Sequence, residues 1–587
     1  MVLLFLREYM KTIINNYEIE TNEQCVINVD EYNHQSIFNF LFKENKNRHI
    51  QIRFSFPAID IVGYWTPHCG MVRDLKSDWW PGFDTMMSIS APIISFYNND
   101  SQNVRTIALS ETSQKVNNRF GVREETGEII CVITIDLIDD LFKDGYSLSI
   151  YQNSKREIYW NVLNKVVSFW ELKENYQSLN SPTFAYAPLY SFWYSYHQNV
   201  SAEIIEKECE EIVKFGFKTI IVDDGWQTDD NHRGYAYTGD WIPSENKFPN
   251  MKEHVLKIQS MGLKYMLWFS VPFVGIYSKS YQTFKDKLLY FDCNAQAGVL
   301  DIRYKEVRDY LKSIYIHAIK DWGIDGLKLD FIDEFYLRKD SPAFNDKMDI
   351  ADVQLALATL LKETKDALKK YKPDLLIEFR QKYIGPEIRQ YGNMLRVTDC
   401  PDSSLANRVG TIDLRLLSHH TAVHSDMLMW NKNDKIENIA LQILSCLFST
   451  IQISISLINL REDVSKTLRF YLDFMSSHID LLQHSQIEPL QPQNLYPYVS
   501  VKNKNLKQEC MVSYVENVYL TLENREKQFY YFNGGPSVKL VIKRTDKKYK
   551  CISKNCMGEI IHTIYLQKEY NEIEMPQCGL LECIEYE

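Results

Sequence analysis

A lysine and an aspartate two residues apart lie near the end of an apolar segment in the middle of the chain. The segment, residues 326–332, reads Gly-Leu-Lys-Leu-Asp-Phe-Ile and predicts a β-strand. Because side chains alternate along a strand, Lys328 and Asp330 would project from the same face near its carboxyl end. A neighbouring cation keeps a carboxylate ionised, and an ionised carboxylate can take part in catalysis. The plainer alternative is a buried ion pair that closes a strand.

The surrounding sequence predicts a (β/α)8 TIM barrel. Strand and helix patterns alternate eight times, and no glycine-rich phosphate loop follows any strand, which disfavours a doubly wound open sheet. The expected strands are residues 189–196, 219–226, 265–271, 326–332, 375–379, 394–399, 422–428 and 452–457. The expected helices are residues 202–215, 251–261, 305–321, 350–370, 387–391, 404–418, 436–448 and 463–482, with Asn250 as the N-cap of the second.

Short alternating segments flank the barrel and predict β-domains on both sides. We therefore expect an N-terminal β-sandwich over residues 1–180, a catalytic barrel over 181–487 and a small antiparallel C-terminal β-sandwich over 488–587. The N-terminal strands are expected at residues 24–29, 50–56, 106–109, 129–137 and 147–151. The C-terminal strands are expected at residues 510–514, 519–522, 528–532, 538–542, 559–565 and 571–575.

Composition narrows the class of protein and its compartment. The net charge of -11 over 587 residues, without a basic tract, argues against a nucleic-acid partner. The apolar run at residues 1–6 is too short for a signal peptide, and no stretch approaches the roughly 18 apolar residues of a membrane span. The twelve cysteines show no metal-ligand spacing, which indicates reduced thiols. We expect a cytoplasmic protein without a membrane partner.

Acidic residues occur at five of the predicted strand ends, where a barrel gathers its chemistry. Cleavage of a glycosidic bond requires two carboxylates on opposite sides of a cleft, and strands four and six face each other across a barrel mouth. Asp330 suits the nucleophile. The acid needs a less solvated, anion-rich setting. Its candidates are Asp399 and Asp402, of which Asp399 is preferred because it closes its strand, whereas Asp402 could cap the next helix.

Further residues around the mouth suit a sugar. Asp223 and Asp224 could accept hydrogen bonds from adjacent hydroxyl groups, and Trp226 could offer a ring face, although two adjacent carboxylates could also hold a divalent cation. Asp240 and Trp241 would add an acid and a ring, or belong to ordinary loop structure. Trp193 on the first strand could line the pocket or the core.

Taken in order, these motifs resemble those of family 36 glycoside hydrolases, the retaining α-galactosidases of clan D. The resemblance implies that Asp330 is the nucleophile and Asp399 the acid/base. It also implies that Asp223 and Asp224 hold the O4 and O6 side of galactose, and that Lys328 and Arg396 flank the substrate. The motifs are Asp223-Asp224-Gly225-Trp226, Gly239-Asp240-Trp241, Asn246-Lys247-Phe248-Pro249, Lys328-Leu329-Asp330 and Thr398-Asp399 ahead of Asp402.

The sequence also departs from that family pattern. Leu329 and Ile332 occupy positions where many members carry the Trp and Asn of K-W-D-x-N, and that Asn contacts the 2-hydroxyl of the sugar. Arg396 precedes Thr398-Asp399 in place of a Trp, as in the related family 27 enzymes. The candidates for the missing contact to the 2-position are Glu378, Arg380 and Cys400.

The motifs and the architecture together predict a retaining exo-α-galactosidase that acts by double displacement, without a cofactor, on a galactosyl oligosaccharide or glycoconjugate. Alternatives within the clan are an α-N-acetylgalactosaminidase, a β-L-arabinopyranosidase and a galactosyltransferase of the raffinose-synthase kind. Alternatives of other classes are a non-catalytic carbohydrate-binding barrel and a metal-dependent barrel hydrolase. The sequence does not set the oligomeric state, and a homo-oligomer is compatible with it.

Overall fold

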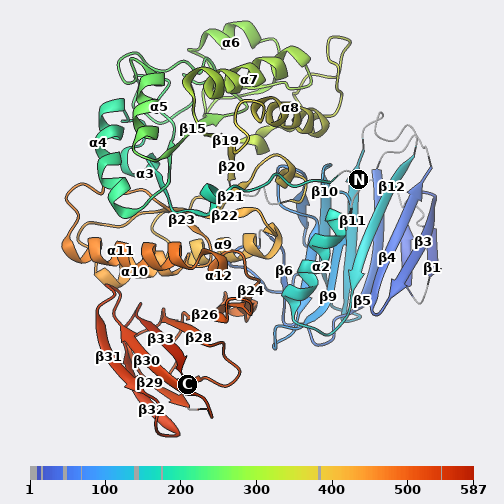
Figure 1. The fold of residues 1–587 in the computed structure, drawn as a ribbon. Coiled ribbons are helices and arrows are strands. Elements are labelled where there is room, and N and C mark those ends of the chain that lie inside the picture. The colour runs from blue at the N-terminus through green and yellow to red at the C-terminus, as the bar shows by residue number, and fades with distance from the viewer. Residues whose placement is uncertain are drawn as a thin grey trace.

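The computed structural model contains a central barrel, an N-terminal pair of sheets beside it and C-terminal sheets below it (Figure 1). Among the described residues no helix is long and apolar enough to cross a bilayer. The apolar run at residues 1–6 lies outside them. The structure describes residues 10–14, 17–43, 49–67, 69–137, 145–172, 176–380, 385–543 and 545–586.

The predicted (β/α)8 barrel is confirmed. Its parallel strands close in sequence order, so that the segment after each strand opens on the same end of the barrel. The strands are β13 (Leu189–Ser191), β14 (Thr219–Val222), β15 (Lys264–Ser270), β19 (Gly326–Asp330), β20 (Leu376–Arg380), β21 (Met394–Arg396), β22 (Ala422–Leu428) and β23 (Thr450–Ile453). The longer helices around them are α4 (Ala202–Ile212), α5 (Met251–Ser260), α7 (Lys305–His317), α8 (Val353–Leu368), α9 (Ser404–Ser418), α10 (Ile436–Leu444) and α11 (Glu462–Ser477).

Six of the eight strands end earlier than the sequence predicts, and three of them bear on the site. The first strand stops at Ser191, and a short helix, α3 (Trp193–Tyr196), follows it. The fourth strand stops at Asp330 because Phe331 adopts a left-handed conformation, with φ of 63°. The sixth strand stops at Arg396, so Asp399 lies in the following loop instead of closing the strand. The predicted N-cap is present, since the Asn250 side chain accepts a hydrogen bond from the backbone N–H of Glu253.

Two elements that the sequence did not reveal adjoin the barrel. A small sheet of β16 (Phe273–Gly275), β17 (Leu288–Asp292) and β18 (Ala297–Leu300), with helix α6 (Lys279–Phe284), extends the segment between β15 and α7. Helix α2 (Tyr159–Glu171) contacts both the N-terminal sheets and barrel helix α9.

The N-terminal β-sandwich packs two antiparallel sheets around a core of apolar side chains. The first sheet has the order β1 (Met10–Ile14), β2 (Tyr17–Thr21), β5 (His49–Pro57), β11 (Glu128–Asp136), β10 (Val116–Arg123) and β7 (Phe83–Thr85). The second has the order β3 (Cys25–Tyr32), β4 (Gln35–Phe42), β12 (Tyr146–Asn153), β9 (Asn103–Leu109), β8 (Ile93–Tyr97) and β6 (Gly63–Trp65).

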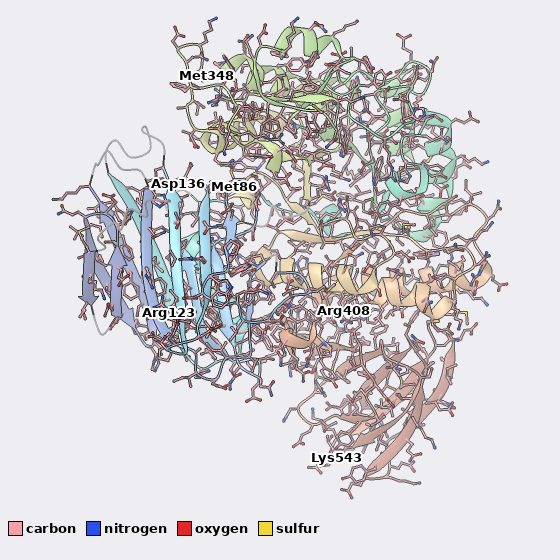
Figure 2. All side chains as sticks on the ribbon, turned by 180° about the vertical axis from the view of Figure 1, so that it is seen from behind. Met86, Arg123, Asp136, Met348, Arg408 and Lys543 are labelled. Atoms are coloured by element: carbon pink, nitrogen blue, oxygen red, sulfur yellow. The ribbon has the colours of Figure 1, made fainter. Side chains whose placement is uncertain are left out.

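The C-terminal sheets are mainly antiparallel, as predicted, but β26 pairs with β28, and β27 with β29, in parallel. Arg408 of α9 (Figure 2) reaches these sheets, and its guanidinium carbon lies 4.1 Å from the ring centre of Tyr514. The strands are β24 (Ile487–Leu490), β25 (Tyr498–Asn503), β26 (Gln508–Ser513), β27 (Tyr519–Thr521), β28 (Gln528–Asn533), β29 (Val538–Lys543), β30 (Lys548–Lys554), β31 (Ile560–Tyr565), β32 (Tyr570–Met575) and β33 (Leu580–Tyr586).

A buried ion pair joins the three parts of the fold. Asp413 of α9 accepts hydrogen bonds from Arg73 at 2.9 Å and from Trp65 at 2.8 Å, both of the N-terminal region, and from the Tyr496 hydroxyl just before β25. The Arg73 and Asp413 side chains are only 2% and 3% exposed. Removal of one partner would leave the other as an uncompensated buried charge.

We expect Asp413→Ala to lower the free energy of unfolding by about 3–5 kcal/mol, measured by urea denaturation. The matched control is Glu211→Ala, which removes the acid of the exposed Glu211–Lys214 pair, 2.7 Å apart on the surface. That change should cost less than about 1 kcal/mol. Equal losses in the two variants would contradict the role of the buried pair.

Candidate active site

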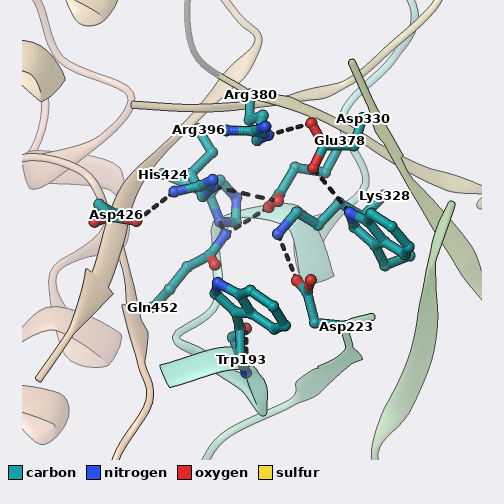
Figure 3. Close-up of polar contacts among 12 residues, drawn as sticks. Trp193, Asp223, Lys328, Asp330, Glu378, Arg380, Arg396, His424, Asp426 and Gln452 are labelled. Carbon is teal, nitrogen blue, oxygen red and sulfur yellow. Dashed lines mark hydrogen bonds and ion pairs between the residues drawn. The ribbon is translucent and has the colours of Figure 1, made fainter. Parts of the chain in front are cut away.

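Asp330 stands at the carboxyl end of β19 with each of its oxygens engaged. Oδ2 accepts a hydrogen bond from the indole N–H of Trp268 at 2.8 Å. Oδ1 accepts from the Phe331 backbone N–H at 2.7 Å and from Nε of Arg380 (Figure 3). The side chain is 6% exposed. The cation that contacts Asp330 is therefore Arg380, and not Lys328 as the strand pattern suggested.

Asp399 reaches the same arginine from the loop after β21. Its Oδ2 lies 3.4 Å from Nη1 of Arg380, and its Oδ1 accepts a hydrogen bond from Nη2 of Arg396 at 2.7 Å. Since one guanidinium contacts Asp330 and Asp399, the nearest oxygens of these carboxylates are at most about 8 Å apart, within the range used by glycoside hydrolases. The structure brings together the two aspartates that the sequence paired.

The surroundings of Asp399 differ from those predicted for an acid. The side chain is 47% exposed, and arginines rather than anions contact it. Partial burial on its own raises the pKa of Asp399, but the charges of Arg396 and Arg380 and the hydrogen bond from Arg396 outweigh it and hold the pKa below its usual range. The two arginines thus favour the ionised form of Asp399.

Asp402, the other candidate for the acid, has different partners. It is exposed, its backbone is left-handed with φ of 57°, and its carboxylate accepts a hydrogen bond from the Gln442 side chain of α10 at 2.9 Å. Asp399 shares the contact with Arg380 that Asp330 makes, whereas the Asp402 carboxylate accepts a hydrogen bond from Gln442. This difference favours Asp399 over Asp402 as the acid.

The turn after β14 holds its two carboxylates in different ways. Asp223 accepts a hydrogen bond from Lys328 at 2.5 Å, and both side chains are buried. Asp224 accepts from the amides of Gln198 at 2.9 Å and Gln227 at 2.7 Å. Burial raises the pKa of Asp224 to about 6, although the two amides oppose that rise.

Backbone contacts fix the shape of this turn. Gly225 has φ of 109°, and a Cβ there would lie 2.4 Å from Cα of Gln198, so only glycine fits. Lys247, from the Asn246–Pro249 motif, donates hydrogen bonds to the backbone oxygens of Gln198 at 2.7 Å and Gly225 at 2.9 Å. The motif thus supports the position of Asp223 and Asp224.

A layer of buried polar side chains lies beside Asp330 in the barrel (Figure 3). Arg396 is 1% exposed and donates to Asp426 of β22 as well as to Asp399. Glu378 is fully buried and accepts a hydrogen bond from Gln452 at 2.5 Å. Burial raises the pKa of Glu378, against the charges of Lys328 and Arg396. Glu378 and Arg396 therefore contact other side chains of the barrel interior.

Three predicted sugar-binding residues have structural partners instead. Trp226 is fully buried and Trp241 is 3% exposed, and their rings pack together with centroids 5.9 Å apart. Neither offers a ring face to a sugar. Asp240 accepts hydrogen bonds from the backbone N–H groups of Lys279 and Ser280, at 2.9 and 2.8 Å, and so caps α6. The motif residues look the same in sequence whether they face a pocket or a core.

Trp193 lies at the edge of the site (Figure 3) and is partly exposed. Its ring centroid lies 4.8 Å from that of His197, and the Arg233 guanidinium lies 5.8 Å from the Trp193 ring centre. Arg233 also contacts Nε2 of His197. Trp193 is thus the predicted aromatic residue that remains available to a ligand.

Sequence reasoning missed several residues that shape the site. Trp268 hydrogen-bonds Asp330, and its position in the predicted strand 265–271 was the available signal. Asp426 lies at a predicted strand end, but the sequence did not indicate a function for it. In the structure Asp426 accepts hydrogen bonds from Arg396 and, at 3.0 Å, from the Tyr194 hydroxyl. Gln198 lies in a loop and gave no signal.

Metal binding at the paired carboxylates finds little support in their contacts. In the described part of the chain no group of three or more His, Cys, Asp or Glu side chains is arranged to hold a metal ion. Asp223 is paired with Lys328, and both oxygens of Asp224 accept from amides. The oxygens that would bind a cation already have partners.

A closed parallel barrel with two carboxylates around one guanidinium at its mouth has the architecture of a glycoside-hydrolase barrel. Residues 173–379 match the Melibiase family model. The chain is 27% identical over 159 residues to the probable α-galactosidase C of Aspergillus flavus and to that of Aspergillus oryzae. Each alignment covers 24% of this chain and 21% of the relative's length, so the chain spans about a fifth of these curated relatives.

Solved structures share the whole architecture. The α-galactosidase of Lactobacillus brevis aligns with a TM-score of 0.64 and 12% identity, over 99% of this chain and 83% of that one. A variant of the GH36 α-galactosidase AgaA of Geobacillus stearothermophilus, in complex with raffinose, aligns with a TM-score of 0.65 and 14% identity, over 98% and 83%. The family resemblance predicted from the motifs is confirmed, and these structures share the three-part fold.

The raised pKa of Asp224 makes stability depend on pH. Below about pH 4 the side chain is protonated in both folded and unfolded chains, and above about pH 6 it is ionised in both, so its burial cost appears as pH rises between these values. Asp224→Asn cannot ionise. We expect the stability of this variant relative to wild type to rise by about 2–3 kcal/mol across that window in urea unfolding. Parallel curves would contradict the burial effect.

Proposed function

We propose that the chain is a retaining exo-α-galactosidase that releases terminal α-linked galactose through a covalent galactosyl-aspartate. The observation that carries the proposal is the shared contact of Asp330 and Asp399 with Arg380, because it brings two carboxylates to one site at a spacing suited to glycoside cleavage. The melibiase match over residues 173–379 supports the choice of sugar.

In the first step Asp330 attacks the anomeric carbon while Asp399 protonates the leaving oxygen. The hydrogen bonds favour Oδ2 of Asp330 as the attacking atom, because Oδ1 accepts two N–H groups and Oδ2 accepts one. These donors fix the carboxylate in one orientation, so that little motion is needed for attack.

In the second step Asp399, now an anion, takes a proton from water, and that water attacks the anomeric carbon and releases Asp330. Asp399 is suited to this exchange because its side chain is 47% exposed and can meet water, whereas Asp330 is nearly enclosed. Its charge is stabilised by Arg396, which is itself held by Asp426.

We propose an oligosaccharide that ends in α-galactose as the substrate. The structures of the related Geobacillus enzyme were determined with raffinose and stachyose. In this chain the partly exposed Trp193, at the edge of the same site, is available to offer a ring face to a sugar.

Nitrophenyl glycosides test this assignment. We expect wild type to turn over the α-galactoside, and we expect Asp330→Asn to lower kcat at least about 10³-fold because no covalent intermediate forms. Azide should rescue Asp330→Asn with β-galactosyl azide as the product. In Asp399→Asn azide should instead give α-galactosyl azide, since there it attacks the galactosyl enzyme.

The leaving group identifies the acid. Asp399→Asn should lower kcat/KM about 10²- to 10⁴-fold for substrates with poor leaving groups and spare kcat/KM for activated ones, because only the former need a proton in the first step. Asp402→Asn is the matched control and should show no such dependence. If Asp402→Asn alone shows it, the assignment of the acid is wrong.

Inactivity of wild type on a panel that includes N-acetylgalactosaminide and arabinopyranoside substrates would favour a non-catalytic binding barrel.

A chelator separates carboxylate catalysis from metal catalysis. We expect wild-type activity to be unchanged after dialysis against EDTA, since Asp223 and Asp224 are engaged by Lys328 and by amides. Activity that is lost in EDTA and restored by one divalent cation would replace the proposed mechanism with a metal-dependent one.

A further inference from the structure

Arg380 contacts both carboxylates of the proposed mechanism, and Figure 3 shows its contact with Asp330. Its Nε donates to Asp330, and its Nη1 lies 3.4 Å from Asp399. The side chain is 6% exposed, and its guanidinium carbon lies 4.7 Å from the ring centre of Phe331. The buried Arg380 guanidinium therefore packs on the Phe331 ring and contacts one aspartate through Nε and another through Nη1.

The proposed reaction moves one negative charge across this arginine. In the first step an oxygen of Asp330 bonds to the anomeric carbon, the electron pair of the glycosidic bond goes to the leaving oxygen, and that oxygen takes the proton of Asp399. The charge has then passed from Asp330 to Asp399. In the second step water gives its proton to Asp399 and its oxygen to the anomeric carbon, and the charge returns to Asp330.

The other cations of the site cannot follow this charge. Lys328 is hydrogen-bonded to Asp223. Arg396 contacts Asp399 but is fixed by Asp426 in the buried layer. Within the described residues Arg380 is the cation that hydrogen-bonds Asp330 and also contacts Asp399.

We propose that Arg380 is a shared counter-ion, paired with Asp330 before galactose is attached and with Asp399 while the galactosyl enzyme exists. The inference rests on the proposed function and assigns a role in both of its steps to Arg380. A preorganised charge near atoms whose charge changes lowers the energy of both transition states without reorganisation of water. The longer contact, to Asp399, is the one that a glycosidic oxygen beside Asp399 would interrupt.

This exchange would prepare the acid only when substrate is present. Arg380 and Arg396 keep the pKa of Asp399 low in the empty site despite its partial burial. Substrate that separates Arg380 from Asp399 removes one of these charges, so Asp399 can hold a proton. The charged and titratable groups that face Asp399 are Arg396, Arg380, Lys328, Asp426, Tyr194 and Cys400.

The pH dependence of kcat/KM tests the role of Arg380, because it reports the ionisation of the free enzyme. Arg380→Gln removes the charge, and we expect the basic limb to move to higher pH by about one unit or more, with kcat about 10- to 100-fold lower. Arg380→Lys keeps a charge and should keep the limb near the wild-type position and regain part of kcat. Arg156→Gln, which removes a surface arginine of the N-terminal region, should change neither.

The protonation of Asp399 can also be followed without turnover, by the infrared band of its carboxyl group with Asp399→Asn as the blank. We expect the titration midpoint of substrate-free enzyme to be higher in Arg380→Gln than in wild type. If wild type lacks glycosidase activity, the proposed function fails, and this midpoint still tests the contact between Arg380 and Asp399. Should Arg380→Gln not fold, Arg380→Met serves in its place. An unchanged midpoint and limb would overturn the inference.

Discussion

The balance of charge inside the barrel mouth is the constraint on which the site depends. Several carboxylates converge there, and each ionised one must be paired or hydrogen-bonded because water is largely excluded. Asp223 has Lys328, Asp426 has Arg396, and Arg380 is divided between two aspartates. Three cations thus balance the charge of these carboxylates and fix their positions. Loss of any one cation would leave an uncompensated anion.

The strand pattern predicted much of this arrangement. Residues 265–271 were expected as a strand and β15 spans Lys264–Ser270, because an apolar run between turn residues has few alternatives. Asp330 and Asp399 could be brought together from their strand numbers, since only β20, which ends at Arg380, separates β19 from β21 in the closed barrel. A single sequence is sufficient where topology, and not side-chain detail, determines proximity.

Side-chain partners could not be read in the same way. The spacing of Lys328 and Asp330 suggested a pair, yet Lys328 reaches Asp223 on a neighbouring part of the barrel. Trp226 looked like a sugar platform, yet tertiary packing covers it completely. Which neighbour a long side chain reaches depends on strand stagger and on the volume of adjacent residues, and neither quantity is local in the sequence.

The junction at Asp413 has a consequence for the independence of the barrel. Its partners come from positions as far apart as Trp65 and Tyr496, on either side of the barrel. An excised barrel would leave the Asp413 carboxylate without Arg73, Trp65 and Tyr496 and open to solvent. The barrel therefore depends on both flanking regions for the partners of a side chain in its own helix α9.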